Sequence, residues 1–238
     1  MPIELITGAI FLAAGFVQGV TGFGSALIAL PLLSLYLDIK VAVPLCILNS
    51  MVITTTMALQ LRHQLDWRKI LPLCLAAIPG ILLGVTVLKN SGSELIRISL
   101  GLLLISYSLY SLLATPRPRN LHPAWSLPAG FLSGLIGSIF SAGGPPTIIY
   151  ATIGNWPKDQ IKATLTGFFL FNSYLIAIAQ TSSGLINLSV LGLFAYAAPM
   201  VFAGTLLGGR CYGLLKKDSY LKVIFAFLIL MGMMLLVT

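Results

Sequence analysis

Residues 15–24 read GFVQGVTGFG, and residues 130–146 read GFLSGLIGSIFSAGGPP. Both segments lie inside apolar stretches, where a helix is expected to run without a break. Inside a helix, glycine costs about 1 kcal/mol relative to alanine and proline costs about 3 kcal/mol. Two helices interrupted in the same way therefore predict a duplicated structural feature that ordinary helix packing does not require.

The composition excludes a water-soluble globular domain. Hydrophobic residues make up 58% of the 238-residue chain and charged residues only 8%, whereas a soluble domain has about 25% charged residues. Apolar stretches recur near the ~20 residues that a helix needs to cross a bilayer, at 41–59, 70–88, 95–114, 163–180, 188–208 and 220–237. We therefore predict an all-α polytopic membrane protein with about eight hydrophobic segments and up to about ten helices.

The two broken segments align when the sequence is shifted against itself by about 115 residues. This shift superposes glycine on glycine: Gly15 on Gly130, Gly19 on Gly134 and Gly22 on Gly137. Further along, Asn49-Ser50 matches Asn172-Ser173. Matches in this order are typical of a duplicated unit. We place the first membrane repeat at residues 1–113, a connecting linker at 114–124 and the second membrane repeat at 125–238.

The basic residues indicate how the two repeats are oriented. If each broken segment enters the membrane and returns to the side it came from, every Lys and Arg falls on one side except Lys40, Lys89 and Arg97. The positive-inside rule favours this uneven division over the more even one that single crossings give. Each repeat then has a re-entrant, Gly-rich helical hairpin plus three transmembrane helices. The repeats are therefore expected to be inverted, with a cytoplasmic linker and both termini outside.

In an inverted arrangement the two breaks approach each other from opposite faces of the membrane. Irregular backbone at this depth is tolerated only where protein or a water-filled cavity satisfies its polar groups. A new helix follows each break, and the free N–H groups and partial positive charge at its N-terminus favour an anion without a buried Lys or Arg. The candidate substrate-binding residues are the two tips and the two Asn-Ser pairs: Thr21, Gly22, Phe23, Gly24, Ser25, Asn49, Ser50, Ser141, Ala142, Gly143, Gly144, Pro145, Thr147, Asn172 and Ser173.

Four other glycines of these segments have the small-xxx-small spacing of closely packed membrane helices. We assign Gly15, Gly19, Gly130 and Gly134 to packing on that basis.

The remaining ionisable residues argue against proton coupling and catalysis. All six acidic residues fall at span ends or in loops, so no carboxylate is placed for a proton relay within the membrane. His63 and His122 lie in loops, and no serine within a span has an evident base, so we expect no enzyme activity. We also expect no cofactor, no bound metal and no nucleic-acid partner.

GFVQGVTGFGSALIALPLL at 15–33 and GFLSGLIGSIFSAGGPPTIIY at 130–150, with the Asn-Ser pairs and the order of spans, resemble the sulfite exporter TauE/SafE family. This family is also called the toluene sulfonate uptake permease family, and the resemblance covers essentially the whole chain. It implies a bacterial or archaeal inner-membrane permease for sulfite, organosulfonates and related sulfur anions.

We accordingly expect a permease that moves a small sulfur-containing anion by alternating access around a midplane site. Export from a negative-inside cell gains about 2.3 kcal/mol per charge per 100 mV, so it needs no coupled ion. The expected partners are the anion, the lipid bilayer and a second copy of the chain in a homodimer. Two alternatives stay open: a non-transporting scaffold subunit, and a cation or metal permease that uses Met51 and Met57.

Overall fold

The computed structural model describes residues 3–113, 121–154, 156–211 and 217–237, and every regular element in these residues is a helix. The first half contains α1 (Ile3–Thr21), α2 (Ser25–Leu33), α3 (Ile39–Leu61), the short 3-10 helix η1 (Arg62–Gln64), α4 (Trp67–Asn90) and α5 (Ser93–Leu113). The second half contains the 3-10 helix η2 (Pro123–Trp125), α6 (Ser126–Phe140), α7 (Gly144–Ile153), α8 (Lys158–Ser182), α9 (Leu188–Arg210) and α10 (Lys217–Val237). The all-α class predicted from the sequence is confirmed.

Seven helical segments of the described chain are long and apolar enough to cross a membrane. They are α1, α3 with η1, α4, α5, η2 with α6, α8 and α9. α2 and α7 have only nine and ten residues, which at 1.5 Å per residue gives each a length of about 14–15 Å, half of a bilayer core. These lengths are those of a polytopic membrane protein that also contains short helices within its bundle. Of the predicted linker, residues 114–120 lie outside the described residues.

Each half begins with a pair of helices separated by a three-residue break, at 22–24 and at 141–143. Both breaks start with a left-handed residue, Gly22 at φ 89° and Ser141 at φ 56°. The equivalent positions of the two breaks are thus 119 residues apart, and not the 115 that superposed the most glycines. The error arises because each segment has two glycines four residues apart. An alignment shifted by about one helical turn therefore still places glycine on glycine.

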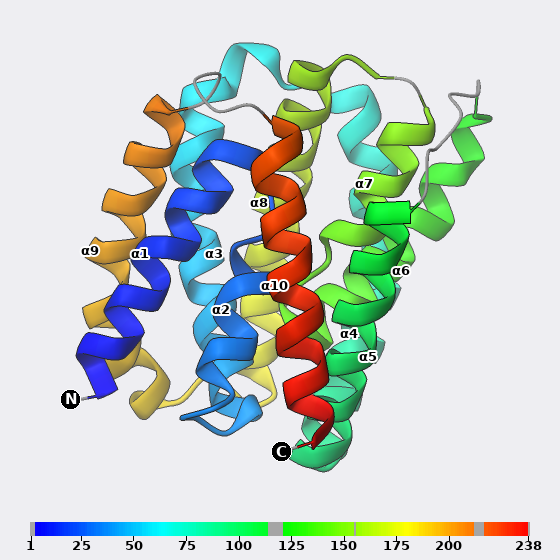
Figure 1. Ribbon diagram of the computed structural model, residues 1–238. Coiled ribbons are helices and arrows are strands. Elements are labelled where there is room, and N and C mark those ends of the chain that lie inside the picture. The colour runs from blue at the N-terminus through cyan, green and yellow to red at the C-terminus, as the bar shows by residue number, and fades with distance from the viewer. Residues whose placement is uncertain (1–2, 114–120, 155, 212–216, 238) are drawn as a thin grey trace.

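The two broken pairs extend toward opposite ends of the bundle. In Figure 1, α1 begins at the lower end and α2 runs back toward that end from the first break, whereas α7 runs from the second break toward the upper end. The start of α1 and the end of α10 both lie at the lower end (Figure 1). The long helices α3 and α8 contact each other between the two broken pairs.

Glycine pairs bring the backbones of facing helices into contact. The most extensive helix contacts are α1 against α9 and α4 against α6. Every one of these helices carries two glycines four residues apart: Gly15 and Gly19, Gly80 and Gly84, Gly130 and Gly134, Gly204 and Gly208. A Cβ at any of these positions would lie 2.1–2.6 Å from a carbonyl oxygen of the facing helix. The packing role predicted for Gly15, Gly19, Gly130 and Gly134 is therefore confirmed, and close backbone approach is the usual basis of helix association in lipid.

Gly208→Ala is expected to lower the thermal unfolding midpoint of the detergent-solubilised protein. A Cβ at position 208 would lie 2.1 Å from the Phe16 carbonyl oxygen, and overpacking of this kind costs about 1–3 kcal/mol. Gly192→Ala is the matched control, because this glycine lies in the same helix with nothing within 4 Å of an added Cβ and alanine is the better helix former. A midpoint for Gly208→Ala at or above that of Gly192→Ala would contradict this account of the α1–α9 contact.

Candidate functional site

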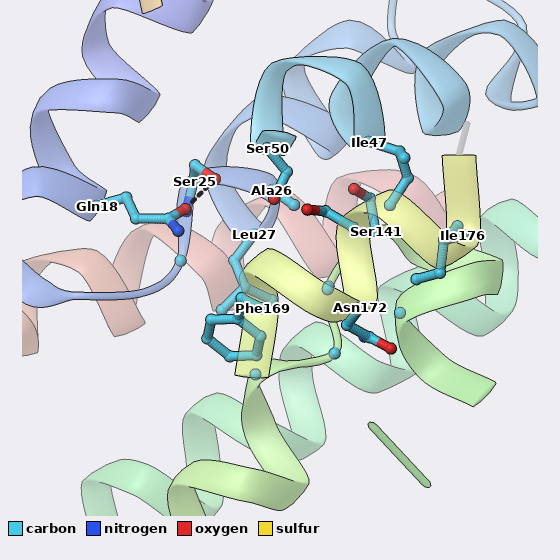
Figure 2. Close-up of a pocket in the computed structure, with 16 residues that line it drawn as sticks. Gln18, Ser25, Ala26, Leu27, Ile47, Ser50, Ser141, Phe169, Asn172 and Ile176 are labelled. Carbon is cyan, nitrogen blue, oxygen red and sulfur yellow. Dashed lines mark hydrogen bonds between the residues drawn. The ribbon is translucent and has the colours of Figure 1, made fainter. Parts of the chain in front are cut away.

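A cavity lies where the two breaks approach each other. The first half lines it with Gln18 of α1, residues 24–27 at the start of α2, and Ile47 and Ser50 of α3. The second half lines it with Gly137 of α6, residues 141–144 at the second break, and Phe169, Asn172, Ser173 and Ile176 of α8. Its volume is about 40 Å³, which is room for a few water molecules or one small ion. Figure 2 shows the labelled side chains around this space.

The start of α2 is fixed by the side chain of Gln18. Its Oε1 accepts hydrogen bonds from the Ser25 N–H, at 3.2 Å, and from the Ser25 hydroxyl (Figure 2). The next N–H groups, those of Ala26 and Leu27, belong to the first turn and have no acceptor within the helix. Both residues line the cavity. This helix end therefore presents backbone donors and the positive end of its dipole to the cavity.

The start of α7 presents fewer backbone donors than the start of α2. Pro145 and Pro146 occupy its first turn, and proline has no N–H. The second break instead offers the hydroxyl of Ser141, whose oxygen is buried and has no hydrogen-bond partner. Ser141 holds this position with a left-handed backbone, which is uncommon for a residue other than glycine.

The wall formed by α8 carries a second unpaired polar group. The Asn172 side chain is 4% exposed, and its Oδ1 is buried without a hydrogen-bond partner. Beside it, the Ser173 hydroxyl lies 3.3 Å from the hydroxyl of Thr54, which joins α8 to α3. An unsatisfied buried polar group costs about 1–3 kcal/mol, so Ser141 and Asn172 are available to a water molecule or a polar ligand in the cavity.

Nine of the predicted site residues line the cavity together: Gly24, Ser25, Ser50, Ser141, Ala142, Gly143, Gly144, Asn172 and Ser173. Six do not line it: Thr21, Gly22, Phe23, Asn49, Pro145 and Thr147. These six hold the surrounding backbone or face other helices.

The Thr21 hydroxyl accepts a hydrogen bond from the Phe23 N–H at 3.1 Å, which stabilises the turn of the first break. The Thr147 hydroxyl donates to the Gly144 carbonyl at 3.0 Å and so stabilises the first turn of α7. Asn49 is fully buried, and its side-chain amide donates to the Leu45 carbonyl at 2.9 Å on its own helix. These three side chains therefore act on local structure rather than on the contents of the cavity.

The other two non-glycine residues of this set lie at the edges of the site. The ring of Phe23 reaches the second break, since a Cβ at Gly144 would lie 4.0 Å from it. Pro145 lines a separate apolar groove between α5, α6 and α7.

Two polar residues of the site region were not predicted, Gln18 and Lys162. Gln18 is the one amide within GFVQGVTGFG, but its spacing to Ser25 matches no standard helix cap. The sequence predicted an anion site that needs no buried Lys or Arg. The residues that line the cavity include neither, but one buried lysine lies beside the first break. The Lys162 side chain is 9% exposed and its Nζ donates to the Gly19 carbonyl at 3.1 Å. Lys162 lies near the start of a span, where its position in the sequence resembles that of the loop charges.

Comparison with known proteins identifies a family match over almost the whole chain. A family model described as sulfite exporter TauE/SafE matches residues 7–235. The chain is 26% identical over 227 residues to a protein of Cupriavidus necator named "Probable sulfite/organosulfonate exporter TauE", a match that covers 92% of this chain and 88% of that protein. No solved structure matches the chain.

Ser141→Gly is expected to raise the free energy of unfolding by about 1 kcal/mol, because a left-handed backbone costs a residue with a Cβ about 1–2 kcal/mol. Ser182→Gly is the control. Ser182 lies in the last turn of α8, where glycine is expected to cost about 0.5–1 kcal/mol. Thermal unfolding in detergent should therefore give shifts of opposite sign for the two variants, and equal losses of stability would rule out a strained Ser141.

Proposed function

The chain belongs to the sulfite exporter TauE/SafE family and is a membrane transporter, and we propose that it exports a small sulfur-containing anion, sulfite or an organosulfonate, across the cell inner membrane. The observation that carries this proposal is the cavity between the two breaks. It combines the N-terminus of α2 with the unpaired hydroxyl of Ser141 and the side chain of Asn172, whose NH2 group can donate to an anion, and no acidic side chain lines it.

The chemistry of the cavity favours an anion. Backbone N–H groups at a helix N-terminus, together with the helix dipole, form a ready anion site. The side-chain amides and hydroxyls around it can donate further hydrogen bonds to the oxygens of a sulfite or sulfonate group. The printed name of the Cupriavidus necator relative, a sulfite/organosulfonate exporter, supports a sulfur anion as the cargo.

Two inverted repeats that exchange conformations would give this site alternating access. The helix contacts support such a repeat, because the most extensive contacts of one half have counterparts in the other. α1 packs on α9 as α6 packs on α4, and α3 packs on α9 as α8 packs on α4. The opposite directions of the two broken pairs in Figure 1 agree with an inverted relation.

The contact made by α2 differs from that of its counterpart α7, and this difference supports a moving element. α2 contacts α10. Its counterpart α7 is separated from α5 by an apolar groove of about 800 Å³. In the proposed cycle, α7 closes on α5 while α2 leaves α10, and the cavity then opens to the opposite side of the membrane.

The distribution of charge supports an orientation with both termini outside. Arg62, Arg68 and Arg210 lie where α3 ends, α4 begins and α9 ends, at the upper end of Figure 1. By the positive-inside rule this end would face the cytoplasm. The membrane potential would then favour anion movement toward the end that holds the termini.

Asn172→Asp is expected to lower sulfite flux in proteoliposomes at least about tenfold, because a negative charge in the cavity wall repels an anion at low effective dielectric. Asn187→Asp makes the same chemical change outside the cavity. Asn187 caps α9 by accepting a hydrogen bond from the Val190 N–H, and aspartate caps equally well, so this control should retain wild-type flux. Absence of sulfite and organosulfonate flux in the wild type, or full flux in Asn172→Asp, would overturn the proposal.

Cys211 tests the orientation without a fusion protein. It is partly exposed at the end of α9, whereas Cys46 and Cys74 are buried. A membrane-impermeant maleimide should label Cys211 in inside-out vesicles and not in intact cells. Gly92→Cys, introduced together with Cys211→Ser, places a thiol in the open turn between α4 and α5 and should show the reverse pattern. Labelling of Cys211 in intact cells would contradict the proposed orientation.

A further inference from the structure

Helix α8 caps both broken helices at equivalent positions. The last carbonyl groups of α1 and α6 have no partner within their helices. Lys162 donates to the Gly19 carbonyl at 3.1 Å, and Gln180 donates to the Ser138 carbonyl at 3.3 Å. Gly19 and Ser138 both stand two residues before the end of their helix. They are 119 residues apart, the same separation as Gly22 and Ser141, the left-handed residues that begin the two breaks.

The two caps differ in charge although they satisfy the same backbone group. Gln180 is fully buried and neutral, and its amide is a sufficient donor for the carbonyl of α6. Lys162 places an ammonium on the carbonyl of α1, and it is the one buried Lys or Arg of the residues whose side chains the structure describes. Removing a cation from water is costly. Capping alone therefore does not account for a lysine at this position.

Lys162 also contacts the first break itself. The Cγ of Lys162 would lie 3.0 Å from a Cβ at Gly22, so its aliphatic stem packs directly against the left-handed turn. Its acceptor Gly19 adjoins Gln18, which lines the cavity and fixes the start of α2. Asp159, one turn earlier on α8, is exposed and interacts electrostatically with the lysine. The ammonium is thus held against the segment that forms one wall of the cavity.

From this geometry we infer that Lys162 is a positioning and specificity-determining residue, which fixes the first break and supplies a positive charge beside the anion cavity. The inference rests on the proposed function as an anion exporter. Lys162 does not line the cavity. Together with the N-terminus of α2, it would give the site its preference for negative charge.

Lys162→Gln separates the two roles, because it retains an amide donor of the kind that Gln180 uses and removes the charge. Its KM for sulfite in proteoliposomes is expected to rise about tenfold, the order expected for a nearby unit charge at low effective dielectric, while Vmax stays within about twofold. The rise should persist at high salt because buried charges are weakly screened. Lys162→Arg keeps the charge and should retain the wild-type KM.

Gln180→Met is the matched control at the second break. It removes the cap of α6 without a change of charge, so it should lower the thermal unfolding midpoint and leave KM unchanged. Wild-type flux with an unaltered KM in Lys162→Gln, or an equal rise of KM in Lys162→Arg, would overturn the inference and leave the proposed function standing. Absence of anion flux in the wild type would overturn both.

A second variant covers the case in which Lys162→Gln does not fold. Asp159→Asn removes the negative charge beside the lysine and leaves the hydrogen bond to Gly19 in place. Its KM at low ionic strength is expected to fall about twofold, and an unchanged KM would overturn the inference.

Discussion

The arrangement of this protein depends on how polar backbone groups are satisfied inside a membrane-spanning bundle. A break in a helix frees carbonyl groups on one side and N–H groups on the other, and lipid satisfies neither. The carbonyls at the ends of α1 and α6 accept hydrogen bonds from side chains of α8, and Gln18 accepts a hydrogen bond from the first N–H of α2. The N–H groups that remain belong to Ala26 and Leu27, which line the cavity. The structural cost of the break and the chemistry of the site therefore have the same origin.

Much of the fold follows from sequence patterns that act locally. Apolar stretches of membrane-spanning length predicted the long helices, and glycine and proline within such stretches predicted the two breaks. The correspondence between the halves was four residues in error, since pairs such as Gly15 and Gly19 match themselves after one helical turn. The ends of α1 and α6, each followed directly by a left-handed residue, identify Gly22 and Ser141 as equivalent.

The site was predicted less completely, because the direction of a side chain depends on packing between distant segments. Asn49 and Asn172 occupy matching motifs, yet Asn172 lines the cavity while Asn49 bonds to the carbonyl of its own helix. Lys162 was counted as a loop charge because its acceptor, Gly19, is 143 residues away in the sequence. A local pattern identifies which segments meet, but it does not determine which face of each helix turns inward.

The two halves are alike in packing and unlike in chemistry. The start of α2 offers the N–H groups of Ala26 and Leu27, whereas two prolines remove such groups from the start of α7. The cap of α1 carries a charge and that of α6 does not. Positive potential is thus concentrated on the first break, and neutral hydrogen-bonding groups on the second. In the proposed transporter, the negatively charged oxygens of the sulfite or sulfonate group would point toward α2. The rest of an organosulfonate would then extend toward Ser141 and α8, so this second wall would distinguish among sulfur anions of similar charge.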